Sequence, residues 1–542
     1  MASCVLVSFA GYPYTPSSLC PDNGLAVLAA VLRAAGHDVR ILDLGTVDTM
    51  RRLYPPELSG RAAPVVMQLA AASGQPSLAL VQELARLDAE LEQVQAAETA
   101  VLAREIAREI KSLDPALVGF KLWNGDGFTG SVTIAREVRK ALPNVPIIAG
   151  GPQATWAGNV IFRYTDVFDA IVVGEAEDKI AELTRQAAEH GRIDSMPGVA
   201  AAPGIPPSPT ATVDIAQTPV ALYDPDVYPA MVGDQKLKIL VLDDSRGCPF
   251  GCAFCMHTYE SGARLRTRPA SRIVDDIQQL MGSTGIRAFR FAGSSTPGAL
   301  MGEVGQEIIC RGLDVAYTSF AHFSTSQPEH YQRMKASGLH ALFFGLETGS
   351  RELLKRACGK PLKLEEVRRA VAGAGEAGIK TVCSMIVPMP FETEETLAAS
   401  LSLLLELRPD SVPIQFPGLL PGTRWFNDPQ AFGFEMDRDS YIEQHLDYKF
   451  KMLFPPAFWK APGYTVNGMS FREFTAITAR FAGQLEAEGI LTGVPDEMML
   501  MAQLSGIAPR QFRDRARLWC STGQADAVQE FVTRFNRAAT VS

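Results

Sequence analysis

The sequence lacks any uninterrupted apolar run of about 18 residues, the length that a membrane-spanning helix requires. Its first residues, MASCVLVSFAGYPYTP, contain neither a basic stretch nor a long apolar segment, so they do not resemble a secretory leader. We therefore expect a cytoplasmic protein that has no membrane partner.

Basic residues are fewer than acidic residues in this sequence. The 542 residues include 51 Lys and Arg against 60 Asp and Glu, which gives a formal net charge of −9. Binding to a nucleic-acid backbone needs a concentrated positive surface, so this balance argues against nucleic acid as the main partner. Hydrophobic residues make up 47% of the chain, which is enough for the cores of two or three globular domains.

Cysteine is sparse except at one place. Six of the nine cysteines are scattered, whereas Cys248, Cys252 and Cys255 fall within the eight residues CPFGCAFC. A disulfide would leave one of these three thiols over. Two metal centres fit the spacing: a zinc ion with His257 as fourth ligand, or an iron–sulfur cluster with one iron free of protein cysteine. The motif alone does not decide between them.

Short apolar runs alternate with helical patterns through residues 1–195, and more helices are inserted at about 50–113. This alternation predicts a doubly wound parallel sheet, whose ligands bind at the carboxyl ends of the strands. Those ends read YPYTP, NGDGFTGS, AGGPQAT and VGEAE. Gly150 and Gly151 would let a ligand approach the backbone closely, although a simple turn is the commoner reason for two glycines after a strand.

Residues 196–235 are rich in Pro and Ala and are predicted to form a linker. Residues 236–428 contain six strand patterns with helical patterns between them, which predicts a partial barrel of six β/α units. The cysteine loop follows the first of these strands, where α/β barrels place their chemistry. Residues 429–542 are predicted to be a mostly helical third domain, whose Tyr441, Phe450, Phe458 and Trp459 would cover the lateral opening of the barrel.

The chain as a whole resembles the cobalamin-dependent radical SAM enzymes. The resemblance rests on the cysteine motif with Phe254 before its last thiol, on GLETGS and MIVPMPFETEET, and on PDNGLAVLAAVLRAAGH, IIAGGPQAT and VVGEAE in the first region. It implies a cobalamin-binding domain followed by a radical SAM barrel. It also implies a [4Fe-4S] cluster on Cys248, Cys252 and Cys255, with S-adenosylmethionine on the fourth iron and an external one-electron reductant of the flavodoxin or ferredoxin type. Zinc then becomes the minor alternative.

The resemblance also implies roles for single residues. Contacts to S-adenosylmethionine are expected from Phe254, Ser294, Ser295, Glu347 and one arginine of ARLRTR, with Arg266 preferred over Arg264 and Arg268. Contacts to cobalamin are expected from Gly150, Gly151, Gly174 and Glu175. The loop after the first strand lacks the histidine with which other cobalamin domains ligate cobalt, so Tyr12, Tyr14 and Arg61 are candidates for the lower face. His257 and Tyr259 are expected beside the cluster as catalytic groups.

Three functions are consistent with this resemblance. The first is transfer of a methyl group from S-adenosylmethionine, via methylcobalamin, to a carbon of a small apolar or partly aromatic metabolite in antibiotic biosynthesis. Methylation of tryptophan at C2 is one such reaction known in the family. The second is a rearrangement, cyclisation or ring contraction without methyl transfer. The third, a non-enzymatic cobalamin carrier or sensor, would leave the cysteine loop unused.

Overall fold

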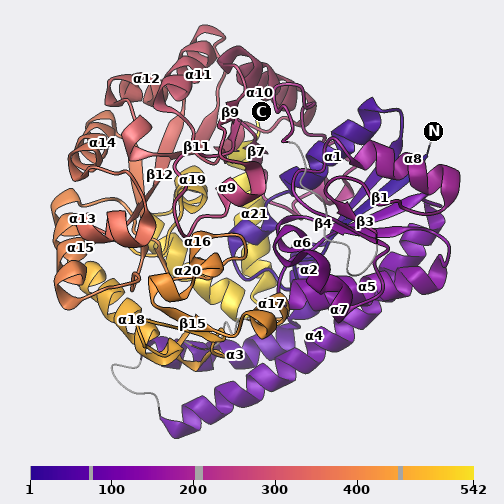
Figure 1. Ribbon diagram of the computed structural model, residues 1–542, viewed down its shortest axis with the longest axis horizontal. Helices are drawn as coiled ribbons and strands as arrows, with labels where there is room; N and C mark the ends of the chain where they lie inside the picture. Colours follow the sequence, from indigo (N-terminus) through magenta and orange to yellow (C-terminus); the bar gives the residue numbers. More distant parts are fainter. Residues whose placement is uncertain (1, 72–76, 202–211, 450–453, 455, 542) are drawn as a thin grey trace.

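The computed structural model describes residues 2–71, 77–201, 212–449, 454 and 456–541. Two parallel sheets lie side by side, with helices around both of them (Figure 1). No helix in these described ranges is long and apolar enough to cross a membrane.

The first sheet has the strand order β2-β1-β3-β4-β5-β6, in which β6 is antiparallel to β5 and the other neighbours are parallel. Its strands are β1 (Ser3–Ser8), β2 (Asp38–Asp43), β3 (Leu117–Lys121), β4 (Ile147–Gly150), β5 (Ala170–Val172) and β6 (Val199–Ala200). The strands read as apolar runs because helices bury both faces of the sheet. The order reverses beside β1, so a binding crevice is expected beyond the carboxyl ends of β1 and β3. The predicted doubly wound sheet is confirmed.

Helices surround this sheet as predicted. Helix α1 (Asn23–Ala34) begins where the Asp22 side chain accepts a hydrogen bond from the Leu25 backbone N–H at 3.1 Å. The inserted helices are α2 (Val47–Leu53), α3 (Pro56–Ala71) and α4 (Leu78–Ser112), and the remaining ones include α5 (Asp126–Ala141), α6 (Pro152–Ala157) and α8 (Ile180–His190). The long helix α4 buries leucines and isoleucines at helical spacing, which attaches the insertion to the domain.

The second sheet has six parallel strands in the order β14-β13-β12-β11-β10-β7. These are β7 (Leu240–Leu242), β10 (Ala288–Phe291), β11 (Ala316–Ala321), β12 (Leu339–Glu347), β13 (Lys380–Ile386) and β14 (Ile414–Gln415). Helices α10 (Ala270–Thr284), α11 (Gly298–Cys310), α12 (Tyr331–Ala336), α14 (Leu364–Ala377) and α15 (Glu394–Leu407) accompany them. All six strands lie where the sequence predicted them, and a partial barrel of six units is confirmed.

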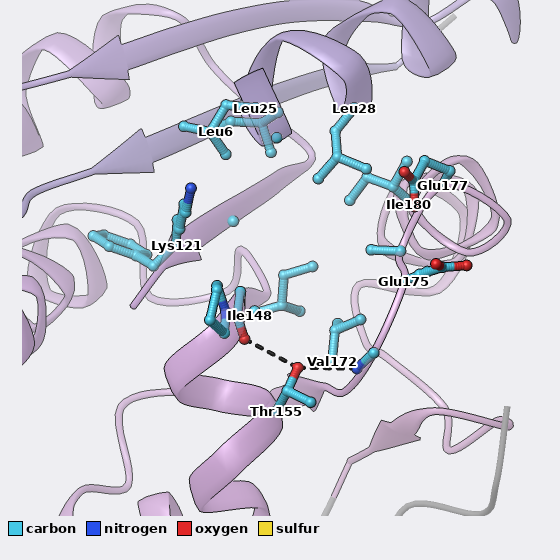
Figure 2. A pocket seen from close by; sticks show the side chains of 18 of the residues that line it. Leu6, Leu25, Leu28, Lys121, Ile148, Thr155, Val172, Glu175, Glu177 and Ile180 are labelled. Atoms are coloured by element: carbon cyan, nitrogen blue, oxygen red, sulfur yellow. Dashed lines mark hydrogen bonds between the residues drawn. The ribbon is translucent and has the colours of Figure 1, made fainter. Parts of the chain in front are cut away.

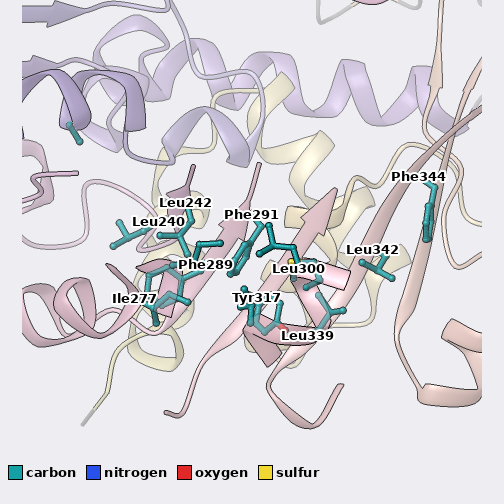
Figure 3. Packing of buried hydrophobic residues seen from close by; sticks show 14 of the residues in the cluster. Leu240, Leu242, Ile277, Phe289, Phe291, Leu300, Tyr317, Leu339, Leu342 and Phe344 are labelled. Atoms are coloured by element: carbon teal, nitrogen blue, oxygen red, sulfur yellow. The ribbon is translucent and has the colours of Figure 1, made fainter. Parts of the chain in front are cut away.

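Alternate residues of the barrel strands face opposite sides. Phe289, Phe291 and Tyr317 pack in the core formed with the outer helices (Figure 3). Ala288 and Ala316, one step along the same strands, belong instead to a core shared with the C-terminal helix α19 (Asp496–Leu504). The small alanines therefore leave room for that helix against the inner side of the barrel.

The C-terminal region is mostly helical, as predicted. It contains α17 (Arg438–Leu446), α18 (Phe471–Ala487), α19, α20 (Pro509–Ser521) and α21 (Ala525–Ala539), with a short hairpin of β15 (Phe434–Met436) and β16 (Tyr464–Val466). However, α19 joins both other regions: Asp496 pairs with Arg290 of β10 at 2.7 Å, and Glu497 accepts from Ser17 at 2.9 Å. The predicted separate third domain is thus a region that shares cores with both sheets. Apolar helix faces look the same in a sequence whichever partner they bury against.

The predicted linker also packs closely where it is described; its residues 202–211 lie outside the described ranges. Strand β6 extends the first sheet, and the buried Tyr228 hydroxyl donates to Asp43 and accepts from the Asp22 backbone N–H. Lys236 pairs with the same Asp43 carboxylate at 2.6 Å. Pro and Ala content therefore indicated an irregular segment correctly, but did not indicate how firmly it attaches to the first sheet.

Candidate functional site

A cavity of about 310 Å³ opens at the carboxyl edge of the first sheet (Figure 2). Most of its wall is apolar side chains from the strands and from α1 and α8, namely Leu6, Leu25, Leu28, Ile148, Val172, Ile180 and Leu183. An apolar cavity with a few placed polar groups is typical of a site for an organic ligand or cofactor.

Glycines form one side of this cavity. Gly150, Gly151 and Gly174 all line it, as the sequence predicted for residues close to a ligand. Gly151 has a φ of 92°, and a Cβ there would lie 3.0 Å from Cγ of Lys121. The Thr155 hydroxyl donates to the Gly151 carbonyl at 3.1 Å and accepts from the Gly174 N–H at 3.0 Å, as the dashed lines in Figure 2 show. The two glycine loops are therefore held together, and a ligand can reach their backbone.

Charged residues connect this cavity to the second sheet. Glu175 forms a bidentate pair with Arg266, at 2.6 and 2.9 Å, and Glu177 pairs with Arg246 at 2.6 Å. Arg246 also holds Asp243 at 2.8 Å. Both terminal nitrogens of Arg266 are engaged by the first domain and by neighbouring carbonyls, and its predicted contact with the carboxylate of S-adenosylmethionine stays a prediction.

Helix α9 (His257–Ser261), which directly follows the cysteine loop, closes the cavity with Glu260 and Ser261. Glu260 accepts a hydrogen bond from Nε1 of Trp156 at 2.6 Å, and burial raises the pKa of this carboxyl above its usual range. Arg246, just before the loop, lines the cavity as well. The cavity and the cysteine loop thus share one wall.

The cysteine loop runs from β8 (Ser245–Arg246), which pairs with β9 (Arg266–Thr267), to α9. Its backbone is fixed by bonds from the Cys248 N–H to Gly262 at 3.1 Å and from the Cys255 N–H to Cys252 at 3.1 Å. Burial raises the pKa of Cys252 to about 12 and that of Cys255 to about 11. Buried thiolates need a compensating positive charge, which iron supplies in a cluster held by cysteines.

The zinc alternative finds no support in this geometry. Among the described residues, no group of three or more His, Cys, Asp and Glu side chains is arranged to hold a single metal ion. A tetrahedral zinc site would need its sulfur and nitrogen ligands within about 2.0–2.3 Å of one ion. Three free thiols on one loop match the number of cysteines that a four-iron cluster with one open iron requires.

Glu347 ends β12 beside this loop, as predicted. It has a φ of 69°, which is uncommon for a residue other than glycine, and its carboxylate pairs with the buried Lys360 at 3.0 Å. The carboxylate lies near enough to Cys252 and Cys255 to contribute to their raised pKa values. Sequence reasoning missed Lys360, because a single lysine after a helical pattern has no distinguishing signal.

Three other predicted residues lie around the loop. Ser294 contacts Nδ1 of His257 at 3.4 Å, and Ser295 is buried in the same turn. Asp244 fixes this turn by accepting from the Gly293 N–H at 2.9 Å and from Thr296 at 2.7 Å. The structure therefore brings the serine turn, His257 and the cysteine loop together.

Phe254 of the motif and Tyr259 of α9 differ in their surroundings. Phe254 packs on Trp425, with ring centroids 5.6 Å apart. Tyr259 is 50% exposed and its ring covers Gly422, where any Cβ would collide with it. Their predicted roles with S-adenosylmethionine and in catalysis stay predictions.

The residues predicted for the lower face of cobalt do not line the cavity. Tyr12 is 3% exposed and donates its hydroxyl to the Cys520 carbonyl at 2.8 Å. Tyr14 packs edge-on against Tyr12, with centroids 5.0 Å apart. Arg61 forms a bidentate pair with Glu90 on the inserted helices. Each of these side chains has a partner within the chain, and the predicted contacts of Tyr12, Tyr14 and Arg61 with the lower face of cobalt stay predictions.

Comparison with known proteins agrees with this geometry. A family model described as "Radical SAM superfamily" matches residues 243–404, and one described as "B12 binding domain" matches residues 72–184. An uncharacterized methyltransferase of Pyrococcus horikoshii is 26% identical over 332 residues, which are 59% of this chain and 70% of that protein. An anaerobic magnesium-protoporphyrin IX monomethyl ester cyclase of Cereibacter sphaeroides is 25% identical over 56% of this chain and about half (52%) of its own length.

Among solved structures, the radical S-adenosylmethionine methyltransferase TsrM of Kitasatospora setae, with cobalamin and a [4Fe-4S] cluster bound, superimposes with a TM-score of 0.61. The match covers 97% of this chain and all of that one at 16% identity, so it shows a common fold. The B12 model accounts for the glycine-lined cavity and implies cobalamin, and the radical SAM model accounts for the cysteine loop and implies the [4Fe-4S] cluster and S-adenosylmethionine. The chain therefore carries a B12 binding domain and a radical SAM domain, which is the pair of domains expected of a cobalamin-dependent radical SAM enzyme.

Proposed function

We propose that this enzyme moves a methyl group from S-adenosylmethionine to a carbon atom of a small, apolar or partly aromatic metabolite. The observation that carries the proposal is the wall shared by the two sites: Arg246, Glu260 and Ser261 flank the cysteine motif and also line the glycine-lined cavity. A methyl carrier in the cavity and a radical source on the cysteine loop would face the same space. Methyl transfer to carbon uses this proximity directly.

When bound, cobalamin supplies a carrier for the methyl group, and the cluster with S-adenosylmethionine supplies a radical that can take a hydrogen atom from carbon. Gly150, Gly151 and Gly174 would hold the nucleotide tail of cobalamin by close backbone approach. Cys248, Cys252 and Cys255 would hold the cluster. Glu347, kept in place by Lys360, would receive the amino group of S-adenosylmethionine. Electrons would come from an external flavodoxin or ferredoxin type of donor, and the proposed setting is the cytoplasm.

Aromatic side chains near the shared wall support an apolar or aromatic substrate. Trp156, which donates to Glu260, lies with its ring 6.1 Å from that of His445 in α17. His445 stacks with the buried Tyr441 at 6.0 Å. Helix α17 packs against α6 of the first domain, and we propose that Tyr441 helps to cover the site; Phe450 lies outside the described residues.

The test is an anaerobic assay of the reconstituted enzyme with methyl-labelled S-adenosylmethionine and a panel of natural-product precursors. Tryptophan belongs in the panel because one TsrM structure contains tryptophan as substrate. Labelled methyl in a carbon-linked product, with equal amounts of 5′-deoxyadenosine and S-adenosylhomocysteine, is the expected result for radical methylation. S-adenosylhomocysteine alone would indicate a polar transfer.

A cyclisation or rearrangement without methyl transfer is the second candidate, and the similarity to the magnesium-protoporphyrin ester cyclase favours it. The same assay separates the two. Formation of 5′-deoxyadenosine without S-adenosylhomocysteine or labelled product would reject the methyltransferase and support the second candidate.

A further inference from the structure

His322 lies immediately after β11, at the end of the barrel that carries the cysteine loop. Its side chain is 9% exposed. One face of the imidazole stacks on Phe250, which stands between Cys248 and Cys252 in the loop; the ring centroids are 3.8 Å apart and the planes differ by 9°. The ring is therefore in direct contact with the loop that would hold the cluster.

The hydrogen bonds of His322 determine where its proton lies. Nδ1 accepts from the backbone N–H of Ser324 at 3.3 Å and contacts the Ser324 hydroxyl at 2.6 Å. A backbone N–H can only donate, so Nδ1 carries no proton. Burial, aided by the nearby Lys360 ammonium, lowers the pKa of His322 to about 3, which keeps the ring neutral. The single ring proton is therefore on Nε2.

That Nε2–H is buried and has no hydrogen-bond partner among the described residues. A buried donor without a partner is destabilising, so native structures rarely leave one unpaired. The ring is stacked and its other nitrogen is engaged, so reorientation would lose the Ser324 bonds and the contact with Phe250. Its missing partner is best explained as an acceptor on a bound group.

We infer that His322 donates a hydrogen bond from Nε2 to an acceptor of the bound cofactor pair, either a sulfur of the [4Fe-4S] cluster or an oxygen of S-adenosylmethionine. The ring's contact with Phe250 and its closeness to Lys360, which pairs with Glu347, place it beside both groups. This inference rests on the cofactors of the proposed function and does not depend on which reaction follows. His322 would be a cofactor-binding residue that no sequence motif identified.

Two variants separate the hydrogen bond from the packing. His322→Phe keeps the aromatic stack with Phe250 and removes both nitrogens. His322→Gln places a terminal amide near the position of Nε2 and so keeps a donor. His340→Phe is the matched control, because His340 is another largely buried histidine but stands at the opposite end of the barrel, at the start of β12. Iron content and thermal unfolding of each reconstituted protein show that the fold and the cluster are retained.

The measurements are redox titration of the cluster by electron paramagnetic resonance, without and with S-adenosylmethionine, and equilibrium binding of S-adenosylmethionine. If the acceptor is a cluster sulfur, His322→Phe should disfavour reduction by about tenfold, which is 59 mV for one electron, because the donor stabilises the more negative reduced cluster. If the acceptor is an oxygen of S-adenosylmethionine, the potential of the free cluster should stay unchanged and affinity should fall by about tenfold. His322→Gln should recover most of either loss.

Unchanged potential and unchanged affinity in His322→Phe, with normal iron content, would overturn the inference. An equal change of potential or affinity in His340→Phe would also overturn the inference, since any buried histidine of the barrel would then have the same effect. Should His322→Phe fail to load the cluster, the same test applies to His322→Gln, which must behave like the unaltered protein. Neither measurement involves a methyl acceptor, so failure of the proposed methyl transfer would leave this result standing.

Discussion

The carboxyl edges of the two parallel sheets are built in opposite ways. The edge of the first sheet presents glycine backbone and apolar side chains around a cavity, as at Gly151 and Ile148. The edge of the second presents thiols and buried charges, such as Cys252 and the Glu347–Lys360 pair. The first suits a large cofactor held by shape, and the second suits a charged cluster held by covalent and ionic contacts. Two parallel sheets of different strand order thus use the same kind of edge for two binding modes, which are set by the side chains after each strand.

The largest expected effect comes from removing the thiols, on which the second edge depends. The triple variant Cys248→Ala, Cys252→Ala, Cys255→Ala should lose the cluster completely, from about four irons per chain, and with it all activity. Cobalamin should still bind, because the glycine wall of the cavity is untouched. Its affinity should fall by up to about tenfold, since the cysteine loop and α9 form another wall of the same cavity. Iron analysis and cobalamin binding measure both. Cys310→Ala, at an exposed thiol on α11, is the control and should retain all iron; loss of cobalamin together with iron would mean that the two edges are not separate.

The reciprocal change is made in the first edge. Gly151→Trp should weaken cobalamin binding by more than about 100-fold, because the φ of 92° disfavours any side chain and the Cβ would already touch Lys121. Iron content should stay normal. Gly158→Trp is the matched control: its φ of 51° is also positive, but nothing lies within 4 Å of its Cβ position and it is not part of the cavity. Equal losses in the two variants would attribute the effect to backbone strain and not to the cavity.

The same contrast explains what the sequence could predict. Strands of both sheets were found because parallel strands buried on two faces read as short apolar runs that end in glycine or polar residues. The thiols were found because their spacing is rare. Gly150 and Gly151 were ambiguous, since two glycines after a strand serve a turn more often than a ligand.

Contacts between distant parts of the chain were not predictable. Glu175 and Arg266 are 91 residues apart, and neither segment contains a signal that their side chains pair with each other. Tyr12 lies in a turn whose composition fits a ligand contact. Its hydroxyl instead donates a hydrogen bond to the Cys520 carbonyl in the C-terminal helix α20. Lys360 and His322 are single residues outside any periodic pattern, so only the folded arrangement shows that they adjoin the cysteine loop.

The next prediction tests whether buried charge supports the second edge. Lys360→Met should lower the free energy of unfolding by about 3–5 kcal/mol, because it leaves the Glu347 carboxylate buried without its partner. Adding Glu347→Gln should recover part of this loss, since the uncompensated charge is then removed. Lys355→Met, at an exposed lysine nearby, should have no effect. Denaturant unfolding of the three variants measures this; an unchanged stability in Lys360→Met would show that the pair is unimportant.

A smaller effect is expected in the pH dependence of stability. Burial, which outweighs its hydrogen bonds, raises the pKa of Asp244 to about 6 from 3.8. Between these two values the folded chain binds more protons than the unfolded chain, so stability should fall as pH rises from about 4 to 6 and then level off, by up to about 3 kcal/mol. Asp244→Asn should remove this slope. An identical slope in the variant would assign it to other groups.

The smallest expected effect is at the wall that the two edges share. Glu177→Gln removes the charge that pairs with Arg246 at 2.6 Å, while Arg246 keeps its bond to Asp243 at 2.8 Å, so the arginine stays compensated. The loss should therefore be about 1 kcal/mol, seen as a roughly fivefold weaker cobalamin affinity with unchanged binding of S-adenosylmethionine. Glu182→Gln on the exposed face of α8, where Glu182 pairs only with its neighbours Arg185 and Gln186 among the described contacts, should change neither. If Glu177→Gln weakened binding of S-adenosylmethionine as much as that of cobalamin, this charge of the first domain would also control the cysteine loop through Arg246, and the two edges would not bind their ligands independently.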